Sequence, residues 1–333
     1  MRPFSYQRLL HPRDIATLQN VSARDAYIAG GTTLLDLMKL DVMRPDRVFD
    51  LDALSQSADL GSIEVTDSGL YLGALVRMAD AADHEHVRGS YPLIRQTLDL
   101  AASQQIRNMA SLGGNVLQRT RCPYFRDTSW SACNKRTPGS GCAAVDGFNR
   151  MHAVLGASDN CIATYPGDFA QALIALDADV LIMSPQGNRT IKFSELHTEP
   201  ADQPEIESTL EPGELIRAFR ILAGPWTRRS AYVKVRDRES YEFAMASAAV
   251  ALHLDGDVVS EARIALGGVA TVPWRAREAE TRLAGKQLDE AAATDAAEAA
   301  FADARVYEHN AFKIELGKAT LVRTLLQVKA MEI

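Results

Sequence analysis

The sequence has no long hydrophobic run, no excess of positive charge and no cysteine outside one short segment. None of its apolar stretches approaches the about 18 residues that a membrane-spanning helix needs. The longest candidate, residues 243–254, also contains His253. The formal net charge of -7 argues against a general nucleic-acid binder, because such proteins neutralise phosphates with cations. The N-terminal segment has no continuous apolar core, so no cleavable export signal is predicted.

The four cysteines, Cys122, Cys133, Cys142 and Cys161, fall within a window of 40 residues. The segment between them is rich in proline, glycine, arginine and lysine, so we do not expect it to order itself by burying apolar surface. The clustering indicates a metal site. A chain of 333 residues can bury a large hydrophobic core, so it does not need disulfides to stabilise its fold.

Four cysteines can form a zinc site, bind an iron–sulfur cluster or pair as two disulfides. Their spacing favours one of these kinds of site without excluding the others. Zinc sites usually contain a short pair of cysteines two to four residues apart, whereas the gaps here are 10, 8 and 18 residues. An iron–sulfur cluster presents several irons to widely spaced thiolates, and cationic neighbours offset its negative charge. Cys122 is also followed by Pro123, as in bacterial ferredoxin motifs. An iron–sulfur cluster is favoured, while zinc, disulfides and free core thiols stay open.

Length and hydrophobic patterning predict two or three domains with mixed α/β or α+β structure. Strand-like runs are expected at 26–29, 48–51, 70–75, 180–183, 190–193, 215–221, 232–235, 246–254 and 258–266. Helical runs are expected at 33–40, 91–102, 168–176, 290–304 and 313–328. The acidic segment 195–214 contains three prolines and is interpreted as a solvated loop.

Two glycine runs have the character of phosphate-binding turns. The first, residues 28–35, sits where a strand is expected to turn into a helix, and its glycines let backbone N–H groups approach an anion. It lacks the spacing of a P-loop and of the GxGxxG fingerprint. The second, residues 110–115, directly precedes the cysteine segment and adds the side-chain donors Ser111 and Asn115. Each run alone is weak, but together they favour a dinucleotide held between them.

An ordered set of motifs resembles the FAD subunit of molybdenum hydroxylases, the xanthine dehydrogenase family. The motifs are AGGTTLLDLMK at 29–39, RNMASLGGN at 107–115, Pro166-Gly167-Asp168, Lys234 and ARIALGGVATVPWRAREAE at 262–280. The resemblance implies an α+β protein. Residues 1–225 would form a two-subdomain FAD-binding domain of the p-cresol methylhydroxylase/vanillyl-alcohol oxidase type. Residues 226–333 would form a C-terminal α+β domain of the CO dehydrogenase flavoprotein type, with helices on an antiparallel sheet.

The resemblance also implies roles for particular residues. The first glycine run would wrap the FAD pyrophosphate with Ile28, Ala29, Gly30, Gly31, Thr32, Thr33, Leu34 and Leu35. The second subdomain would hold it with Ala110, Ser111, Gly113, Gly114 and Asn115. Ala102 and Ile106 would line the cofactor, and Asp168, Ile216 and Lys234 would approach the flavin end. Gly167 stands where the family often has serine, which removes a hydroxyl contact to FAD. No catalytic acid, base or nucleophile is expected, because the cofactors carry the chemistry.

The cysteine segment indicates which members of the family the chain resembles most. Most FAD subunits of the family lack such a loop, whereas those of periplasmic aldehyde oxidoreductase and 4-hydroxybenzoyl-CoA reductase carry one that binds a [4Fe-4S] cluster. The sequence at 121–161 is most similar to the former, which implies a [4Fe-4S]-binding loop at about 119–161 with Cys122, Cys133, Cys142 and Cys161 as ligands.

The implied function is electron transfer in a heterotrimer. A large subunit with the molybdenum cofactor would oxidise aldehydes to carboxylic acids, and a small subunit with [2Fe-2S] clusters would pass the electrons through FAD to an external acceptor. The resemblance implies a periplasmic location reached with a signal-bearing partner, with the cytoplasm as the alternative. One alternative function is the equivalent subunit of a 4-hydroxybenzoyl-CoA reductase-like or other molybdenum hydroxylase. A more remote alternative is a non-enzymatic binding protein whose fold is stabilised by zinc or a cluster.

Overall fold

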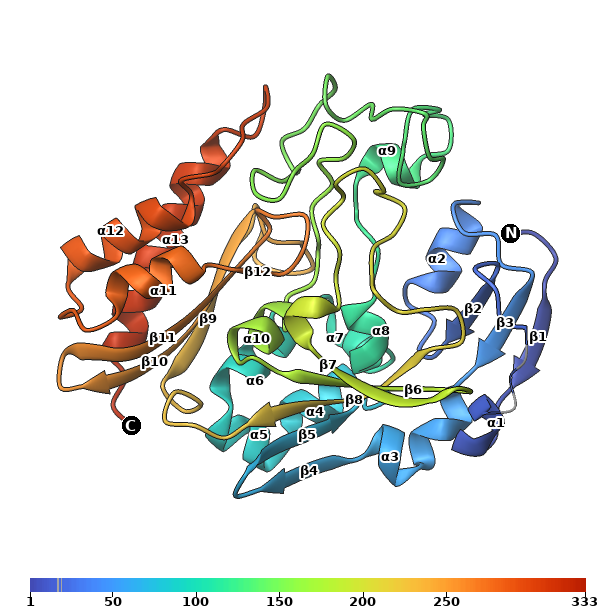
Figure 1. The fold of residues 1–333 in the computed structure, drawn as a ribbon, viewed down its shortest axis with the longest axis horizontal. Helices are drawn as coiled ribbons and strands as arrows, with labels where there is room; N and C mark the ends of the chain where they lie inside the picture. Colours follow the sequence, from blue (N-terminus) through green and yellow to red (C-terminus); the bar gives the residue numbers. More distant parts are fainter. Residues whose placement is uncertain (17, 19) are drawn as a thin grey trace.

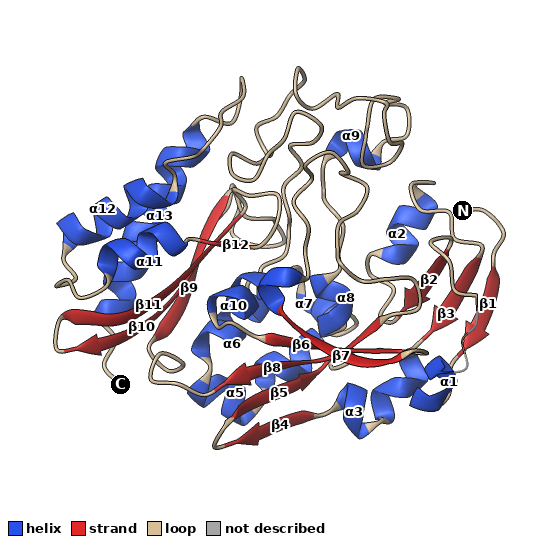
Figure 2. Cartoon of the chain, viewed as in Figure 1, coloured by secondary structure: helices blue, strands red, loops and turns tan. Residues whose placement is uncertain are grey.

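A computed structural model describes residues 1–16, 18 and 20–333 of the chain. Figure 1 shows three β-sheets arranged along the long axis of the molecule, with the cysteine segment as a set of loops above them. Helices cover the sheets and long loops join them, as the colouring of Figure 2 makes plain. The expected α+β class with an antiparallel C-terminal domain is confirmed.

The N-terminal sheet is a small parallel one, with strand order β1-β3-β2. Its strands are β1 (Ser5–Arg8), β2 (Asp25–Ile28) and β3 (Arg47–Asp50), and its helices are α1 (Pro12–Ala16) and α2 (Leu34–Lys39). Parallel strands need a crossover connection, and α2 provides it between β2 and β3. The first glycine run therefore lies at the carboxyl end of β2, where open α/β sheets commonly bind ligands.

The second sheet has five antiparallel strands in the order β4-β5-β8-β6-β7. Its strands are β4 (Ile63–Thr66), β5 (Gly69–Gly73), β6 (Asp179–Ser184), β7 (Gly187–Lys192) and β8 (Leu215–Leu222). The helices in the same part of the chain are η1 (Asp52–Gln56), α3 (Ala58–Gly61), α4 (Met78–Asp83), α5 (Glu85–Ser90), α6 (Pro92–Asp99), α7 (Gln104–Arg107), α8 (Leu112–Val116), α10 (Phe169–Ala175) and η2 (Phe193–Glu195). Helix α9 (Pro123–Arg126) lies away from this sheet, within the cysteine segment (Figure 1).

Helix α6 illustrates why these segments fold as they do. Pro92 occupies its first turn, where the missing N–H costs no hydrogen bond. Its buried residues Leu93, Ile94, Thr97 and Leu98 repeat at the helical period, so one face packs into the core. The Thr97 hydroxyl is satisfied inside the helix by the carbonyls of Leu93 and Ile94.

The C-terminal sheet has four antiparallel strands in the order β12-β11-β10-β9. Its strands are β9 (Ser230–Val235), β10 (Ala246–Asp255), β11 (Val258–Gly267) and β12 (Trp274–Arg275), and its helices are α11 (Arg277–Leu283), α12 (Glu290–Ala300) and α13 (Phe312–Lys329). Helix α12 buries four alanines, which present little bulk to the neighbouring elements. It ends at Ala300, not at the predicted residue 304, because the chain turns there and buries Phe301 in the core.

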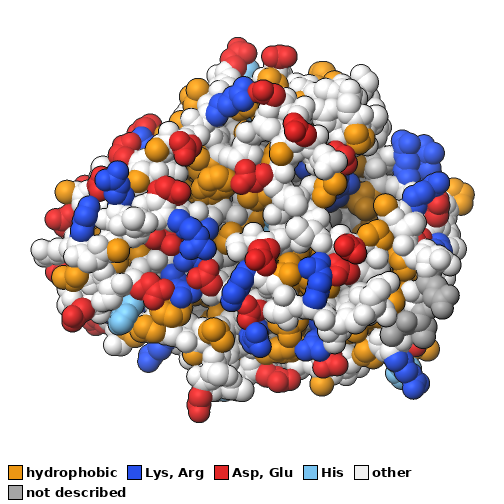
Figure 3. Space-filling model, viewed as in Figure 1, with side chains coloured by type: hydrophobic (Ala, Val, Ile, Leu, Met, Phe, Trp, Pro, Cys, Tyr) orange, Lys and Arg blue, Asp and Glu red, His pale blue; other side chains and the backbone are white. Residues whose placement is uncertain are grey.

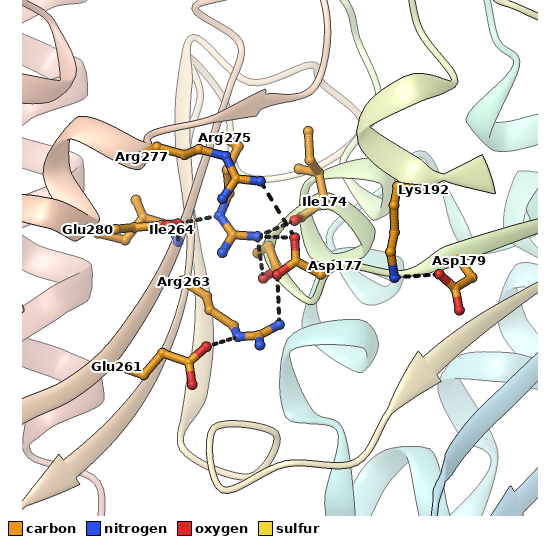
Figure 4. A network of polar contacts seen from close by, with 11 residues as sticks. Ile174, Asp177, Asp179, Lys192, Glu261, Arg263, Ile264, Arg275, Arg277 and Glu280 are labelled. Atoms are coloured by element: carbon orange, nitrogen blue, oxygen red, sulfur yellow. Dashed lines mark hydrogen bonds and ion pairs between the residues drawn. The ribbon is translucent and has the colours of Figure 1, made fainter.

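A network of arginines joins the C-terminal domain to α10 (Figure 4). Arg275 donates to Asp177 at 2.9 Å and to the carbonyl of Ile174 at 2.7 Å, which lies near the end of α10. Arg263 donates to the same Asp177 at 3.0 Å and stacks over the ring of Trp226 at 3.6 Å. Cations at a helix C-terminus satisfy its free carbonyls and oppose its dipole. The domains are therefore held together by directed contacts.

The surface in Figure 3 carries acidic and basic side chains interspersed over the visible face. Among the described residues, the helices are all too short or too polar to cross a membrane.

Candidate functional site

A cavity of about 920 Å³ opens between the N-terminal sheet, α8 and the loop that precedes β8. Its size falls in the range of small-molecule and cofactor sites. Residues 28–34 of the first glycine run form one wall, and Ser111, Gly113 and Gly114 of the second run form another. Ile216 and residues 205–215 close a third side. The two glycine runs, far apart in the sequence, thus face one space, as predicted.

The two glycine runs also touch each other. A Cβ added to Gly30 would overlap the carbonyl oxygen of Met109, which lies just before the second run. Gly31 has a φ of +71°, a backbone conformation that residues other than glycine rarely adopt. At the second run, the Ser111 hydroxyl accepts a hydrogen bond from the Gly114 N–H at 3.2 Å and caps α8. Close packing therefore requires glycine at position 30, and the backbone conformation favours it at position 31.

Seven of the predicted cofactor residues do not line this cavity. They are Leu35, Ala102, Ile106, Ala110, Asn115, Asp168 and Lys234. Eleven do line it: Ile28, Ala29, Gly30, Gly31, Thr32, Thr33, Leu34, Ser111, Gly113, Gly114 and Ile216. The FAD contacts themselves stay predictions for both sets.

Asp168 and Lys234, both predicted near the flavin end, form an ion pair with each other at 2.8 Å. Their side chains are only 6% and 1% exposed. The Tyr232 hydroxyl donates to the other oxygen of Asp168 at 2.5 Å, and burial, reinforced by the charge of Asp168, raises the pKa of Tyr232 well above its usual value. The Lys234 ammonium also donates to the Leu100 carbonyl at 3.0 Å. This pair joins the first turn of α10 to β9.

Replacing Lys234 by methionine is expected to lower the free energy of unfolding by about 3–5 kcal/mol, because it leaves a buried carboxylate without its cation. Urea denaturation of the purified full chain measures the change. The matched control is Lys192→Met, which removes a strand lysine whose side chain is 53% exposed and which also pairs with an aspartate, Asp179. Arg220 still pairs with Asp179 in that variant, so its cost should stay below about 1 kcal/mol. Equal losses in the two variants would contradict the interpretation.

The loop at 195–214 is more than the solvated segment that its composition predicts. Glu207 accepts from Arg119 and pairs with Lys135 at 3.0 Å, and all three residues line the large cavity. Burial alone would raise the pKa of Glu207, but the charges of Arg119 and Lys135 outweigh it and the pKa is lowered. No local sequence pattern indicates this triad, because its members are separated by 16 residues or more.

All four cysteines line a second, small cavity beside the first. None of them is in a disulfide, and Cys133 and Cys142 lie opposite each other in an isolated antiparallel bridge. Lys135, Cys161 and Ala163 line both cavities, so they form the wall between them.

Burial raises the pKa of Cys122 to about 12 and that of Cys161 to about 11. As free thiols these two groups are therefore protonated at neutral pH. His152 lies with its Nε2 3.2 Å from the sulfur of Cys122. Burial, and next the charge of Lys313, lowers the pKa of His152 to about 4, so its ring is neutral.

The four cysteines are the candidate ligands of a metal centre. Within the described part of the chain, no group of three or more His, Cys, Asp or Glu side chains is arranged to hold one metal ion. That arrangement by itself supports neither zinc nor an iron–sulfur cluster. The four unpaired thiols do fit the predicted cluster in kind, in number and in facing one cavity. The cavity has a volume of about 10 Å³, room for about one water, so the loops must separate when a cluster binds.

Comparisons with known proteins cover nearly the whole chain. The family profile "FAD binding domain in molybdopterin dehydrogenase" matches residues 2–221, and "CO dehydrogenase flavoprotein C-terminal domain" matches residues 230–328. The aldehyde oxidoreductase FAD-binding subunit PaoB of Escherichia coli strain K12 is 45% identical over 333 residues, which is 99% of each chain. The glyceraldehyde dehydrogenase medium chain of Sulfolobus acidocaldarius is 25% identical and covers 86% of this chain and 83% of its own. Reconstituted CO dehydrogenase from Oligotropha carboxidovorans shares the fold, with a TM-score of 0.77 at 23% identity over 99% of both chains.

Proposed function

Because the chain belongs to the FAD-binding medium subunits of the molybdenum hydroxylase family, we propose that it is the FAD and [4Fe-4S] electron-transfer subunit of an aldehyde oxidoreductase. It would receive electrons from a large molybdenum subunit and a small [2Fe-2S] subunit and deliver them to an external acceptor. The observation that carries the proposal is the meeting of two glycine runs over one cavity of about 920 Å³ in a chain of this family. Similarity to an aldehyde oxidoreductase subunit over the full length supports the substrate class.

The residues of the large cavity would bind and orient FAD. The backbone N–H groups of the first glycine run and the amino end of α2 suit the negative charge of a pyrophosphate. Ser111 and the glycines of α8 would hold it from the opposite wall. When bound, FAD exchanges one or two electrons, which allows it to connect single-electron carriers to an acceptor. The protein contributes placement and exclusion of solvent, and no side chain is assigned a proton-transfer step.

The cysteine cavity would hold the [4Fe-4S] cluster through Cys122, Cys133, Cys142 and Cys161. A cluster offers separate irons to separate thiolates, so it does not require the close grouping that one zinc ion needs. Cys161 belongs to the wall shared with the FAD cavity, which supports a position of the cluster beside the flavin cofactor. Lys135 lies in the same wall, and its charge lowers the pKa of Cys161 against the larger effect of burial.

The deciding experiment measures flavin, iron and acid-labile sulfide in one sample of the purified complex, together with its visible spectrum. We expect FAD in equal amount to this chain, and iron and sulfide beyond what the [2Fe-2S] subunit contains. A complex that lacks FAD, or that contains zinc in place of iron and sulfide beyond those of the [2Fe-2S] subunit, would overturn the proposal. Turnover of an aldehyde by the same complex distinguishes the proposed function from that of a 4-hydroxybenzoyl-CoA reductase-like complex. The periplasmic location stays a prediction, which fractionation of cells expressing the whole complex tests.

A further inference from the structure

Lys313 is a fully buried lysine near the start of α13, on the side of the C-terminal domain that meets the cysteine segment. Its ammonium has three N–H donors, and the contact found for it is to the carbonyl of Gly268 at 2.6 Å. Within the described part of the chain, no carboxylate pairs with it. Burial, and next the like charge of Arg150, lowers the pKa of Lys313 to about 7. A buried cation without an anion is unfavourable, so the amine stays fully charged at neutral pH only where an anion lies near it.

The neighbouring charges do not supply that anion. Arg150 is itself neutralised by Asp237, to which it donates two hydrogen bonds at 2.7 and 3.0 Å. The positive charge of Lys313 therefore has no counterpart among the described groups that surround it.

The geometry connects Lys313 to the cysteine cavity through His152. Lys313 donates to the Gly268 carbonyl, and the next carbonyl, that of Val269, accepts from the Val154 N–H at 2.8 Å, two residues after His152. The Nε2 of the His152 ring contacts the Cys122 sulfur at 3.2 Å. The other ring nitrogen, Nδ1, is buried without a hydrogen-bond partner. The C-terminal domain is fixed against this part of the cysteine segment, because the Asn310 side chain donates to the Ala153 carbonyl at 3.1 Å. The lysine is thus held close behind one wall of the cavity.

We propose that Lys313 is a positioning residue that supplies the buried countercharge of the group bound by the four cysteines, acting across His152 on the side of Cys122. This inference rests on the proposed [4Fe-4S] cluster. A cluster held by four thiolates carries net negative charge, and its reduction adds one electron without forming or breaking a bond. A fixed cation stabilises the reduced form more than the oxidised form, because the reduced form is the more negative. Lys313 should therefore raise the reduction potential of the cluster.

The test uses the whole complex with Lys313→Met, with Lys313→Arg, and with Lys318→Met as the matched control. Lys318 lies on the same helix but is neutralised by Glu298 and Glu315. A potentiometric titration followed by EPR gives the potential of the cluster. In Lys313→Met we expect the ratio of reduced to oxidised cluster at a given potential to fall about tenfold, a shift of about 59 mV for one electron. Lys313→Arg and the control should match the wild type.

A second measurement keeps the inference testable if Lys313→Met assembles poorly. In the Cys133→Ser chain, which should hold no cluster, Lys313→Met removes an unpaired buried charge and should raise the melting temperature. In the cluster-loaded chain the same substitution should lower it. A change of the same sign and size in both backgrounds would overturn the inference.

The outcomes also separate the two proposals. Full iron content with an unchanged potential in Lys313→Met overturns the role of Lys313 and leaves the cluster in place. A wild-type complex without the additional iron and sulfide overturns both.

Discussion

Replacing Gly30 by alanine is expected to weaken FAD binding about 10- to 100-fold. The added Cβ would overlap the carbonyl oxygen of Met109, and because that atom belongs to the backbone it cannot turn away as a side-chain end could. The overlap must push the two glycine runs apart at the wall of the cavity. Overpacking of this kind costs about 1–3 kcal/mol, and each 1.4 kcal/mol corresponds to a tenfold change in affinity. The ratio of FAD to protein after gel filtration and a fluorescence titration of the FAD-free chain measure the effect.

Gly89→Ala is the matched control for this substitution. Gly89 lies in α5, and a Cβ added there would meet no atom within 4 Å. Alanine favours helix over glycine by up to about 1 kcal/mol, so this variant should be as stable as the wild type or more so, with unchanged FAD affinity. If Gly30→Ala bound FAD as the wild type does, the cavity between the glycine runs would not be the FAD site.

Replacing Cys133 by serine is expected to remove the iron and sulfide held by this chain while FAD stays bound. A serine hydroxyl is a poor substitute for a thiolate, and loss of one ligand opens the cluster to solvent. Cys142→Ser should behave in the same way, because Cys142 lies opposite Cys133 in the same bridge. Neither residue lines the large cavity, whereas Cys161 does. We therefore expect Cys161→Ser to affect both cofactors. Metal analysis and the flavin spectrum of the purified complex distinguish these results.

Ser140→Ala controls for general damage to the cysteine segment. The Ser140 hydroxyl accepts a hydrogen bond from the Cys133 N–H at 3.0 Å, so its removal disturbs the same loop without taking away a thiol. This variant should keep its iron. Zinc in place of iron in the wild type, lost on Cys133→Ser, would show that the segment is a zinc site.

The long, strongly patterned elements were predictable from the sequence. The strands expected at 246–254 and 258–266 are β10 and β11, which pair with each other along most of their length. The strand at 5–8 was missed because all four of its residues are exposed, so it lacks the alternation that marks a half-buried strand. Its existence depends on pairing with β3, which is a tertiary contact.

The candidate site was predictable in part for the same reason. Glycine runs and clustered cysteines are local signals, and in the structure they line two adjoining cavities. The pairing of Asp168 with Lys234 was not foreseen, because the two residues are 66 positions apart and each was expected to face the cofactor separately. The role of Glu207 was also missed, since an acidic, proline-containing segment has the composition of a solvated loop.

The sequence by itself determined the chemistry available to this protein: glycines where the backbone must come close to another chain segment or to an anion, and four thiols in one segment. These properties belong to individual residues and their immediate neighbours, so no fold is needed to read them. The tertiary structure alone decided which charges are compensated. Lys234 is buried against Asp168, and Lys135 in the wall between the two cavities pairs with Glu207, whereas Lys313 is buried with no acid beside it among the residues that the structure describes. Burial and pairing arise from segments that are distant in the chain, and electrostatic energy depends on both.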